Sequence, residues 1–409
     1  MIDPGDPYHV HMIRTLFILF LLQPVFASAQ SSQIRVATFN VEDVRSSDLA
    51  RTDQPRLIEI AEIIQRIRPN VILINEIAYD HPGVDGVPDD AKPGLNGLRF
   101  VENYVNRVEF EGAEPIRYRA YMWESNTGMH SGFDLNNDGD VVGTYEQPTA
   151  SNEKGEPSPQ TSLGRAYGGD AWGFGTFPGQ YAMAILVDER LEVLSEEVRT
   201  FRLMPWEYMP APFVPENPET EEPWYNADEW ATFRLSSKSH WDIPVRLPSG
   251  QVVHFLCSHP TPPAFDGPEN RNKLRNHDEI RFWGDYLSQR GYIVDDENGY
   301  GGLQRGEHFV ILGDLNADPE DPAWERNAIL DHVLLHPRVG RDPKPASDVE
   351  IDGLAPTDTA TWGKRVDYVI QSKRLEVMRA GVWRPTSAEM GSFPSDHFPV
   401  WAEIVVPAP

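Results

Sequence analysis

The 409-residue sequence predicts an α/β protein built around one large core. A strand, a helix and a second strand follow one another between residues 34 and 78, which is the order of an α/β unit. Five or more apolar runs with the length of buried strands recur along the chain, and polar side chains stand where these runs end. Hydrophobic residues make up 40% of the chain, which is enough to bury a sizeable core at this length.

The first α/β unit begins with a predicted strand over residues 34–43, which carries Asn40 and Glu42 near its end. Apolar residues at spacings of three and four then predict a helix that ends at Ile67. The next strand, "VILINEIA", is a buried apolar run that delivers Glu76. Both strands therefore end in oxygen-bearing side chains.

Further strands repeat this pattern, with a helix between two of them. They are predicted over residues 181–188, 252–260, 308–316, 365–370 and 400–406, with the helix over about 270–289. Asp and Asn are common at ordinary turns, so each polar end taken alone fits a structural role. The ends of these strands carry the following residues: His259, Asp314, Asn316, Asp367, Asp396 and His397.

The chemistry of these residues points to a metal-assisted site. A buried carboxylate such as Asp367 is tolerated only when it is paired or ligated. Several carboxylates at one site repel one another unless a cation lies among them. Oxygen ligands of this kind suit Mg²⁺, Mn²⁺ or Ca²⁺. The two histidines would then be available for hydrogen bonding or acid–base roles.

Six short motifs occur in a fixed order across residues 34–406. They are "FNVE", "NE", "SHP", "GDLN", "VDYV" and "SDHFPV", each at a strand end. With these motifs the sequence resembles the endonuclease/exonuclease/phosphatase superfamily. The resemblance implies a four-layer α/β sandwich, in which two face-to-face mixed β-sheets are flanked by helices and the active site lies in a cleft at one edge. It also implies a metal-dependent phosphoric ester hydrolase.

The resemblance implies a divalent-metal site at the first two strands. Glu76 would be the principal ligand, helped by Asn40 and Glu42, and Asp396 would lie near the metal. The expected cofactor is Mg²⁺ or Mn²⁺, which lowers the pKa of bound water and neutralises developing charge.

The resemblance also implies roles for the remaining strand-end residues. Asp314, oriented by Asn316, would position and deprotonate the attacking water. His397, oriented by Asp367, would contact the phosphoryl oxygens, and His259 would stabilise charge or assist the leaving group. Such a displacement needs mostly positioning and electrostatic stabilisation, which these groups can supply.

The N-terminal residues 1–29 predict an extension followed by a signal peptide. The segment from Met12, "MIRTLFILFLLQPVFASAQ", has a basic residue, a short apolar run and an Ala-Ser-Ala cleavage site ending at Ala29. The run is shorter than the ~20 residues of a membrane span, so no stable membrane anchor is expected. The mature domain is predicted over residues 30–409, with a loop-rich insertion at about 80–178, and the protein is expected to be secreted or periplasmic.

The segment "DLNNDGD" in this insertion matches the first half of a calcium-binding loop. Asp134, Asn136 and Asp138 stand at ligand positions one, three and five, and Asp140 would offer its carbonyl next. The usual Glu at position twelve is missing. A structural Ca²⁺ site and a solvated Asn/Asp/Gly turn therefore both remain open.

The net charge of −27 bears on the substrate. A strongly acidic surface disfavours nucleic acid without excluding it, because nucleases gain affinity from Lys and Arg contacts to phosphates. We therefore expect a phosphoester substrate that is small or lipid-borne. A secreted non-specific nuclease and a catalytically inactive binding protein on the same fold are the alternatives. No obligate protein partner is evident.

Overall fold

The computed structural model describes residues 1, 31–107, 112, 114–321, 327–386 and 393–408. Within these residues, twelve strands form two six-stranded sheets that pack face to face, so the predicted sandwich is confirmed. The predicted signal peptide, which begins at Met12, lies outside the described residues. No helix in the described part of the chain is long and apolar enough to cross a membrane.

The first sheet has the strand order β11-β12-β1-β2-β4-β3. Its strands are β1 (Ser32–Val44), β2 (Val71–Ile77), β3 (Tyr118–Tyr121), β4 (Met183–Asp188), β11 (Glu376–Val382) and β12 (Val400–Val406). β1 and β2 run parallel, while β12 pairs antiparallel with β1. The long helix α2 (Pro55–Ile67) connects β1 to β2, which is the predicted α/β unit.

The second sheet has the strand order β10-β9-β8-β7-β5, and β6 pairs with β7. Its strands are β5 (Glu192–Val193), β6 (Arg199–Thr200), β7 (His240–Arg246), β8 (Val252–Ser258), β9 (His308–Asp314) and β10 (Asp367–Gln371). β8 and β9 run parallel and are joined by a connection that contains the helix α6 (Arg271–Leu287). Each sheet thus contains one parallel crossover with a helix.

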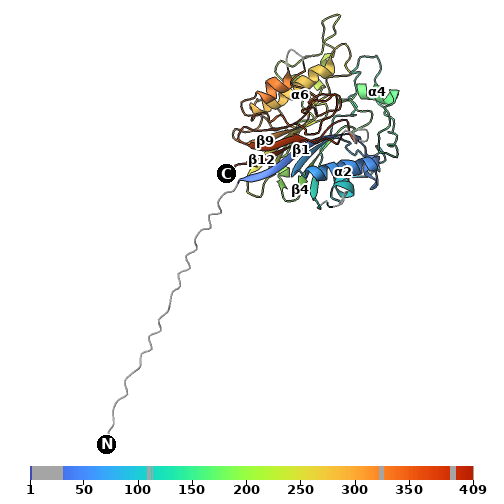
Figure 1. Ribbon diagram of the computed structural model, residues 1–409. Helices are drawn as coiled ribbons and strands as arrows, with labels where there is room; N and C mark the ends of the chain where they lie inside the picture. The colour runs from blue at the N-terminus through green and yellow to red at the C-terminus, as the bar shows by residue number, and fades with distance from the viewer. Residues whose placement is uncertain (2–30, 108–111, 113, 322–326, 387–392, 409) are drawn as a thin grey trace.

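Three apolar clusters separate four layers. One cluster lies between the sheets and draws residues such as Val36 and Phe255 from both of them. A second fills the space between the first sheet and α2, and a third lies between the second sheet and α6. In Figure 1, α2 and α6 accordingly cover opposite outer faces of the sandwich.

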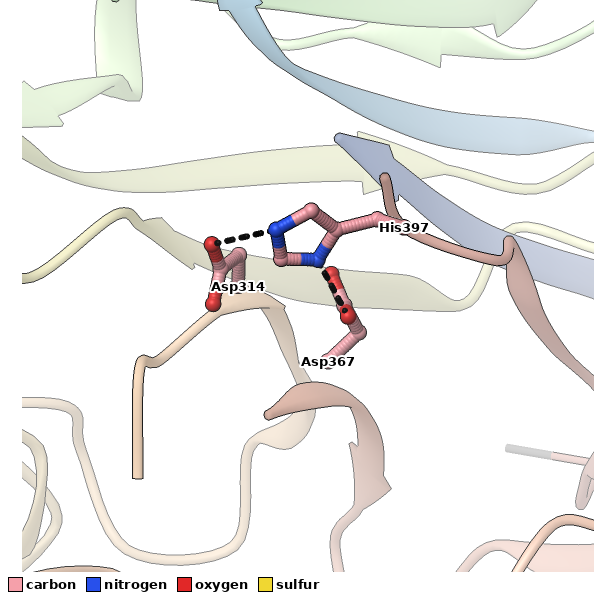
Figure 2. A group of neighbouring side chains, drawn as sticks. All are labelled: Asp314, Asp367 and His397. Atoms are coloured by element: carbon pink, nitrogen blue, oxygen red, sulfur yellow. Dashed lines mark hydrogen bonds and ion pairs between the residues drawn. The ribbon is translucent and has the colours of Figure 1, made fainter. Parts of the chain in front are cut away.

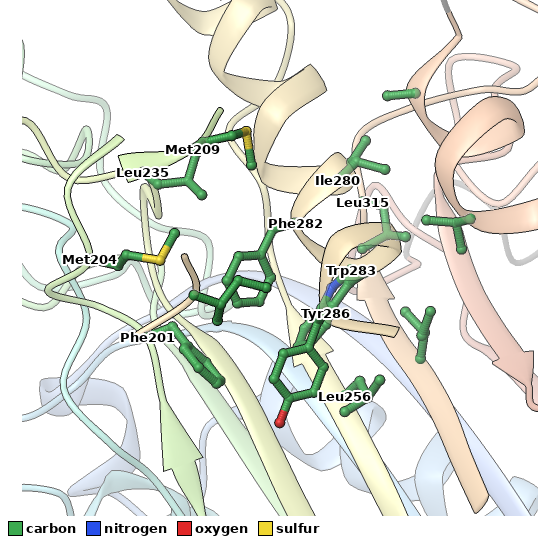
Figure 3. Close-up of a cluster of buried hydrophobic side chains, with 14 of the residues drawn as sticks. Phe201, Met204, Met209, Leu235, Leu256, Ile280, Phe282, Trp283, Tyr286 and Leu315 are labelled. Carbon is green, nitrogen blue, oxygen red and sulfur yellow. The ribbon is translucent and has the colours of Figure 1, made fainter. Parts of the chain in front are cut away.

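The cluster under α6 is rich in aromatic residues (Figure 3). Phe282, Trp283 and Tyr286 of α6 face Phe201 and Leu256 from the sheet side. The Trp283 indole donates to the Ser258 hydroxyl at 2.9 Å, immediately before His259. Large buried side chains thereby fix the end of β8, because truncating them would leave a cavity in a close-packed core.

Short elements occupy the connections and the predicted loop-rich insertion. Those of the insertion are α3 (Asn96–Phe100), the π-helical turn η1 (Val101–Val105), the edge strand β3 and α4 (Ser162–Gly169). The others are α1 (Ser46–Leu49), η2 (Ser195–Glu197), η3 (Trp206–Tyr208), α5 (Ala227–Thr232) and the π-helical turn η4 (Ile329–Leu334). The described residues between 80 and 178 therefore contain regular structure only as short pieces.

Candidate active site

Strand ends from both sheets meet at one edge of the sandwich. In the first sheet, β1 supplies Asn40 and β2 supplies Glu76. In the second sheet, β9 ends at Asp314 and β10 begins at Asp367, which stands directly opposite Asp314 in the antiparallel register. Opposite residues of two paired strands lie close together and project to the same face. This register explains why residues 53 positions apart (367 − 314) meet at one place.

The Asn40 side chain joins the two sheets at this edge. Its Nδ2 donates to Glu76 Oε1 at 3.0 Å and to Asp314 Oδ2 at 3.1 Å. Glu76 Oε2 also accepts from the backbone N–H of Asp43 at 3.2 Å. Asn40 is 1% exposed, and its hydrogen bond to Asp314 is buried. The first-sheet and second-sheet residues therefore form one connected polar cluster.

Unusual backbone geometry aims several of these side chains. Glu42, Asp43, Glu76 and Asn316 have φ angles of 52°, 50°, 66° and 52°, in the left-handed region. The pairing of β1 with β2 shifts register between Asn40 and Val44 at the same place. Non-glycine residues in this region are strained, and such strain concentrates at functional sites. The strand ends are thus bent where the predicted ligands and catalytic groups stand.

Asp314 is the most heavily contacted carboxylate of the cluster. Asn316 donates to it twice, from its backbone N–H at 2.9 Å and from Nδ2 at 3.2 Å. The Nε2 atoms of His259 and His397 lie 3.4 Å and 3.7 Å from Asp314 Oδ2. Burial alone raises the pKa of Asp314, but the two histidines and the Asn316 N–H outweigh it and hold that pKa well below its usual range. Asp314 is therefore ionised at neutral pH.

His397 lies between two carboxylates, as Figure 2 shows. Its Nδ1 is 2.8 Å from Asp367 Oδ2, and its Nε2 faces Asp314. Burial lowers the pKa of His397, but Asp367 and Asp314 outweigh it and hold that pKa well above its ordinary value. The Thr359 hydroxyl accepts from the backbone N–H of Asp367 at 3.0 Å and so fixes the start of β10. The imidazole is therefore held in one orientation and carries a proton.

His259 follows β8 directly and is 2% exposed. Its Nε2 also lies 3.8 Å from Glu76 Oε1, so it contacts residues from both sheets. Burial, and then the positive charge of Lys238, lower the pKa of His259. This histidine is consequently neutral, in contrast to His397.

Acidic groups crowd the open side of the cluster. Burial, and then the nearby Glu76 and Glu42, raise the pKa of Asp396 to about 7, against the opposing effect of His397. Burial and Glu76 likewise raise the pKa of Glu42, while Arg56 lowers it. The side chains of Asp396 and Glu76 keep exposures of 45% and 21%. This side of the cluster is therefore accessible and favours the binding of a cation.

Two sets of residues could hold a metal ion. In the described chain, Asp314, Asp367 and His397 offer ligand atoms within 4.8 Å of one another. However, Nδ1 of His397 is already hydrogen-bonded to Asp367, and a protonated imidazole repels a cation. The second set offers carboxylate and amide oxygens, the donors that Mg²⁺ and Mn²⁺ prefer. It consists of Asn40, Glu42, Glu76 and Asp396, and it fits a divalent metal better.

Lys238 adds a buried positive charge that sequence reasoning missed. It is 5% exposed, and its Nζ donates to the carbonyl of Pro260 at 3.4 Å. Burial lowers its pKa, while Glu279, Glu76 and Asp314 oppose that effect. The only signal in the sequence was a single Lys in "LSSKSH" before an unpredicted strand. Its position beside the site depends on the fold.

Trp362 is a second neighbour that the sequence analysis missed. Its ring meets that of His397 edge-on, with centroids 4.9 Å apart and planes at 85°. A β-bridge pairs Ala360 with His397, and the Thr361 N–H donates to the Asp396 carbonyl at 2.9 Å. Trp362 is nevertheless 50% exposed. This turn therefore presents an exposed aromatic ring next to the predicted active site.

The predicted calcium loop stands apart from this cluster in its contacts. The Asp134 carboxylate accepts from the N–H groups of Asp138 and Gly139 at 3.1 and 2.9 Å. Asp138 in turn accepts from the N–H of Asp140 at 3.0 Å and from the Asn136 amide at 3.0 Å. These contacts shape the turn and are compatible with either interpretation, so the calcium site stays a prediction.

A known protein family matches most of the chain. The model of the Endonuclease/Exonuclease/phosphatase family matches residues 37–397, a range that includes every predicted active-site residue from Asn40 to His397. None of the curated proteins matches the sequence.

Several solved structures resemble the chain at low identity. An endonuclease/exonuclease/phosphatase from Beutenbergia cavernae DSM 12333 is 16% identical with a TM-score of 0.47, and the match covers 92% of this chain and 72% of that one. A mannosyl-6-phosphatase from Bacteroides thetaiotaomicron VPI-5482 is 14% identical with a TM-score of 0.44, covering 91% and 100%. The human Nocturnin catalytic domain with bound sulfate anion is 13% identical with a TM-score of 0.43, covering 91% and 97%.

Proposed function

Because the chain belongs to the endonuclease/exonuclease/phosphatase family, we propose that it is a secreted, divalent-metal-dependent phosphoesterase. Members of this family are hydrolases that act on phosphate esters. The proposal rests on one observation: the ends of strands from both sheets bring Asn40, Glu76, Asp314 and His397 into one connected cluster. A buried carboxylate between two histidines, with a strongly perturbed pKa, is also the kind of group that clusters at catalytic sites.

Asn40, Glu42, Glu76 and Asp396 would hold the metal on the accessible side of the cluster. A bound divalent cation would neutralise negative charge on the phosphate. It would also relieve the repulsion that contributes to the raised pKa values of Glu42 and Asp396. The accessible side of the cluster is therefore where the phosphate group would bind.

Asp314 would orient the attacking water and accept its proton. The double contact with Asn316 fixes the carboxylate, so its remaining lone pairs keep one direction. The protonated His397 would donate to a phosphoryl oxygen, and Asp367 would hold the ring in place. His259 and Lys238 would stabilise negative charge as the leaving group departs. Metal-assisted hydrolysis of this kind needs no covalent enzyme intermediate.

A small or lipid-borne phosphoester is the favoured substrate, either a diester or a monoester. The net charge of −27 opposes the approach of a long polyanion, although screening over roughly 8 Å limits this effect to charges near the site. The exposed ring of Trp362 beside His397 favours a substrate that carries a flat, partly apolar group next to its phosphate, because such groups pack well on an indole ring. A secreted nuclease is the second candidate.

Residues 1–29 would direct export and be removed after Ala29, so the enzyme would act outside the cytoplasm. Export of the full-length chain followed by intact-mass measurement tests this assignment. A mature N-terminus at Gln30 is expected, and retention of residues 1–29 would contradict it.

A substrate panel tests the proposed function. Bis-p-nitrophenyl phosphate, p-nitrophenyl phosphate, sphingomyelin and plasmid DNA are each assayed with Mg²⁺, Mn²⁺ and Ca²⁺. We expect turnover of a small or lipid phosphoester that changes little between low and physiological salt. Rapid plasmid cleavage with a steep salt dependence would identify a nuclease instead. No turnover of any substrate with any metal would identify a binding protein.

A further inference from the structure

A groove of about 620 Å³ lies at the end of the second sheet opposite the active site. It is bounded by the end of α6, the segment before β9, the turn after η4 and the turn between β10 and β11. Residues of the groove stand at the beginning of β9, whereas Asp314 stands at its end. Seven residues of extended strand span roughly 20 Å. The groove is therefore separate from the catalytic cluster.

The groove is cationic on a protein that is otherwise strongly acidic. Its lining includes five cationic side chains and the single carboxylate of Glu307. The chain as a whole has 36 Lys and Arg residues against 63 Asp and Glu residues, so its composition predicts the opposite balance. The five cationic residues are Arg290, Arg305, Arg338, Lys373 and Arg374. A local concentration of positive charge on such a surface indicates an anion site.

Most of this charge is not neutralised within the protein. Among the described residues, Arg305, Lys373 and Arg374 have no carboxylate within ion-pair distance, and all three are exposed. Glu307 approaches His254 of the neighbouring strand, at 3.8 Å between Oε2 and Nε2. Arg290 has only a long contact, 3.6 Å to Asp285. Free cationic groups are thus left facing the groove.

Arg338 gives the groove a rigid cationic floor. Its guanidinium donates to the carbonyls of Leu287, Leu303 and Gln304 at 2.7 to 2.8 Å. It also stacks over the ring of Phe309, 5.6 Å from the centroid. Carbonyl oxygens and an aromatic face hold the group in place without cancelling its charge. A preorganised guanidinium loses little entropy when it binds an anion.

We propose that this groove binds a small molecule carrying two or more phosphate or sulfate groups. Arg side chains match such oxyanions through paired hydrogen bonds, and four Arg residues with a Lys can contact several groups at once. Its volume is typical of a ligand pocket. The cationic residues surround one concavity instead of forming a long stripe, which favours a compact anion over a nucleic acid.

Titration calorimetry with inositol hexakissulfate tests the assignment directly. The sulfate esters are not phosphoesters, and EDTA keeps the metal site empty, so the groove can be measured without hydrolysis. We expect one-to-one binding by the mature protein at physiological salt. The Lys373→Gln/Arg374→Gln variant should bind at least ~10-fold more weakly, because two charge-assisted contacts are lost. Turnover of bis-p-nitrophenyl phosphate with metal should equal that of the wild type.

A matched control separates the groove from the overall charge. Arg246→Gln/Lys344→Gln removes two exposed cations outside the groove and changes the net charge by the same amount. Its affinity should stay within about twofold of the wild type, since distant exposed charges are screened. If the groove variant is less stable on heating, Arg305→Gln supplies the second test.

Three results would overturn the proposal. The first is no binding at millimolar inositol hexakissulfate. The second is an equal loss of affinity in the groove and control variants, which would indicate diffuse electrostatics. The third is tighter binding to anionic phospholipid vesicles or duplex DNA than to the small anion, lost in the groove variant, which would assign the groove to a macromolecular surface.

Discussion

The Asp367→Asn variant tests how His397 is held and charged. Asp367 is 1% exposed, and its Oδ2 lies 2.8 Å from Nδ1 of His397. Asn keeps the size of the side chain and an oxygen acceptor but removes the negative charge. The backbone hydrogen bond from residue 367 to the Thr359 hydroxyl is unaffected by the substitution. The variant should therefore fold and lose mainly the electrostatic hold on the imidazole.

The size of the expected loss follows from this contact. A hydrogen bond to a charged group contributes about 1.5–3 kcal/mol. Since every 1.36 kcal/mol changes a rate tenfold, kcat should fall by about 10- to 150-fold if the bond acts in the transition state. The KM should change less, because Asp367 is buried and contacts His397 instead of the solvent.

The dependence of kcat on pH gives an independent readout. In the wild type, burial lowers the pKa of His397, but the charges of Asp367 and Asp314 have a larger effect and raise this pKa well above its ordinary value. The ring therefore stays protonated to high pH. Removing the charge of Asp367 lowers that pKa. The alkaline limb of the pH–kcat profile should therefore move to lower pH in Asp367→Asn. A matched control is Asp342→Asn, which removes a carboxylate paired with Arg365 instead.

The reasoning is refuted if the kcat of Asp367→Asn stays within about twofold of the wild type and the alkaline limbs of the two pH–kcat profiles coincide. The loss of a charge-assisted hydrogen bond should lower kcat by more than twofold. A parallel shift in the Asp342→Asn control would also refute it, because the effect would then come from overall charge.

Three further predictions concern metal, calcium and acid stability. EDTA should abolish turnover, and Mg²⁺ or Mn²⁺ should restore it. The Glu76→Gln variant should need at least ~10-fold more metal for half-maximal activity. An unchanged metal requirement in this variant would exclude Glu76 as a ligand. Ca²⁺ should raise the melting temperature of the wild type by mass action. The Asp134→Ala/Asp138→Ala variant should lose that rise but keep its response to the active-site metal. If the variant and the wild type respond identically to calcium, only the turn interpretation remains. Hydrogen bonds from Arg379 and then from Arg35 lower the pKa of Glu403 from 4.5 to about 2. These hydrogen bonds therefore stabilise the fold above pH 4.5, and their contribution disappears as the pH falls toward 2. In thermal melts followed by circular dichroism, Glu403→Gln should have a lower melting temperature than the wild type at pH 7, and the difference should vanish near pH 2.

The strands that carry the site could be predicted because two signals coincide in them. The run over residues 308–316 is apolar up to a Gly-Asp-Leu-Asn turn, and β9 indeed occupies His308–Asp314. The strand predicted over residues 34–43 corresponds to β1, Ser32–Val44. Buried strands give continuous apolar runs, and their polar ends are marked by a change in residue type. The polar cluster is formed by those same ends.

Two of the strands that were missed, β7 and β11, lack one of these signals. β7 (His240–Arg246) contains Pro244, which argues against a strand because it cannot donate to the ladder. β11 (Glu376–Val382) lies at the sheet edge and exposes charged residues such as Glu376 and Arg379, so it has no apolar run. Pairing with neighbouring strands forms both elements, and such pairing cannot be read from a local pattern.

The neighbours of the predicted active site were missed for a different reason. Trp362 reaches His397 through a bridge between Ala360 and His397, residues 37 positions apart (397 − 360). Lys238 comes close to Asp314 only because β7 and β9 belong to the same sheet. A single Trp or Lys in a sequence carries no sign of such contacts. Side-chain identity predicted the residues at strand ends, and tertiary structure alone supplied the residues around them.

The kcat of Asp314→Asn on bis-p-nitrophenyl phosphate, measured with saturating Mn²⁺, tests the central claim most directly. Asn preserves the shape of a side chain that is 1% exposed and contacts Asn40 and Asn316. If Asp314 accepts the proton of the attacking water, kcat should fall at least ~10²-fold, the usual scale for a general base. The melting temperature should change little by comparison. Full turnover by a correctly folded Asp314→Asn protein would contradict the account.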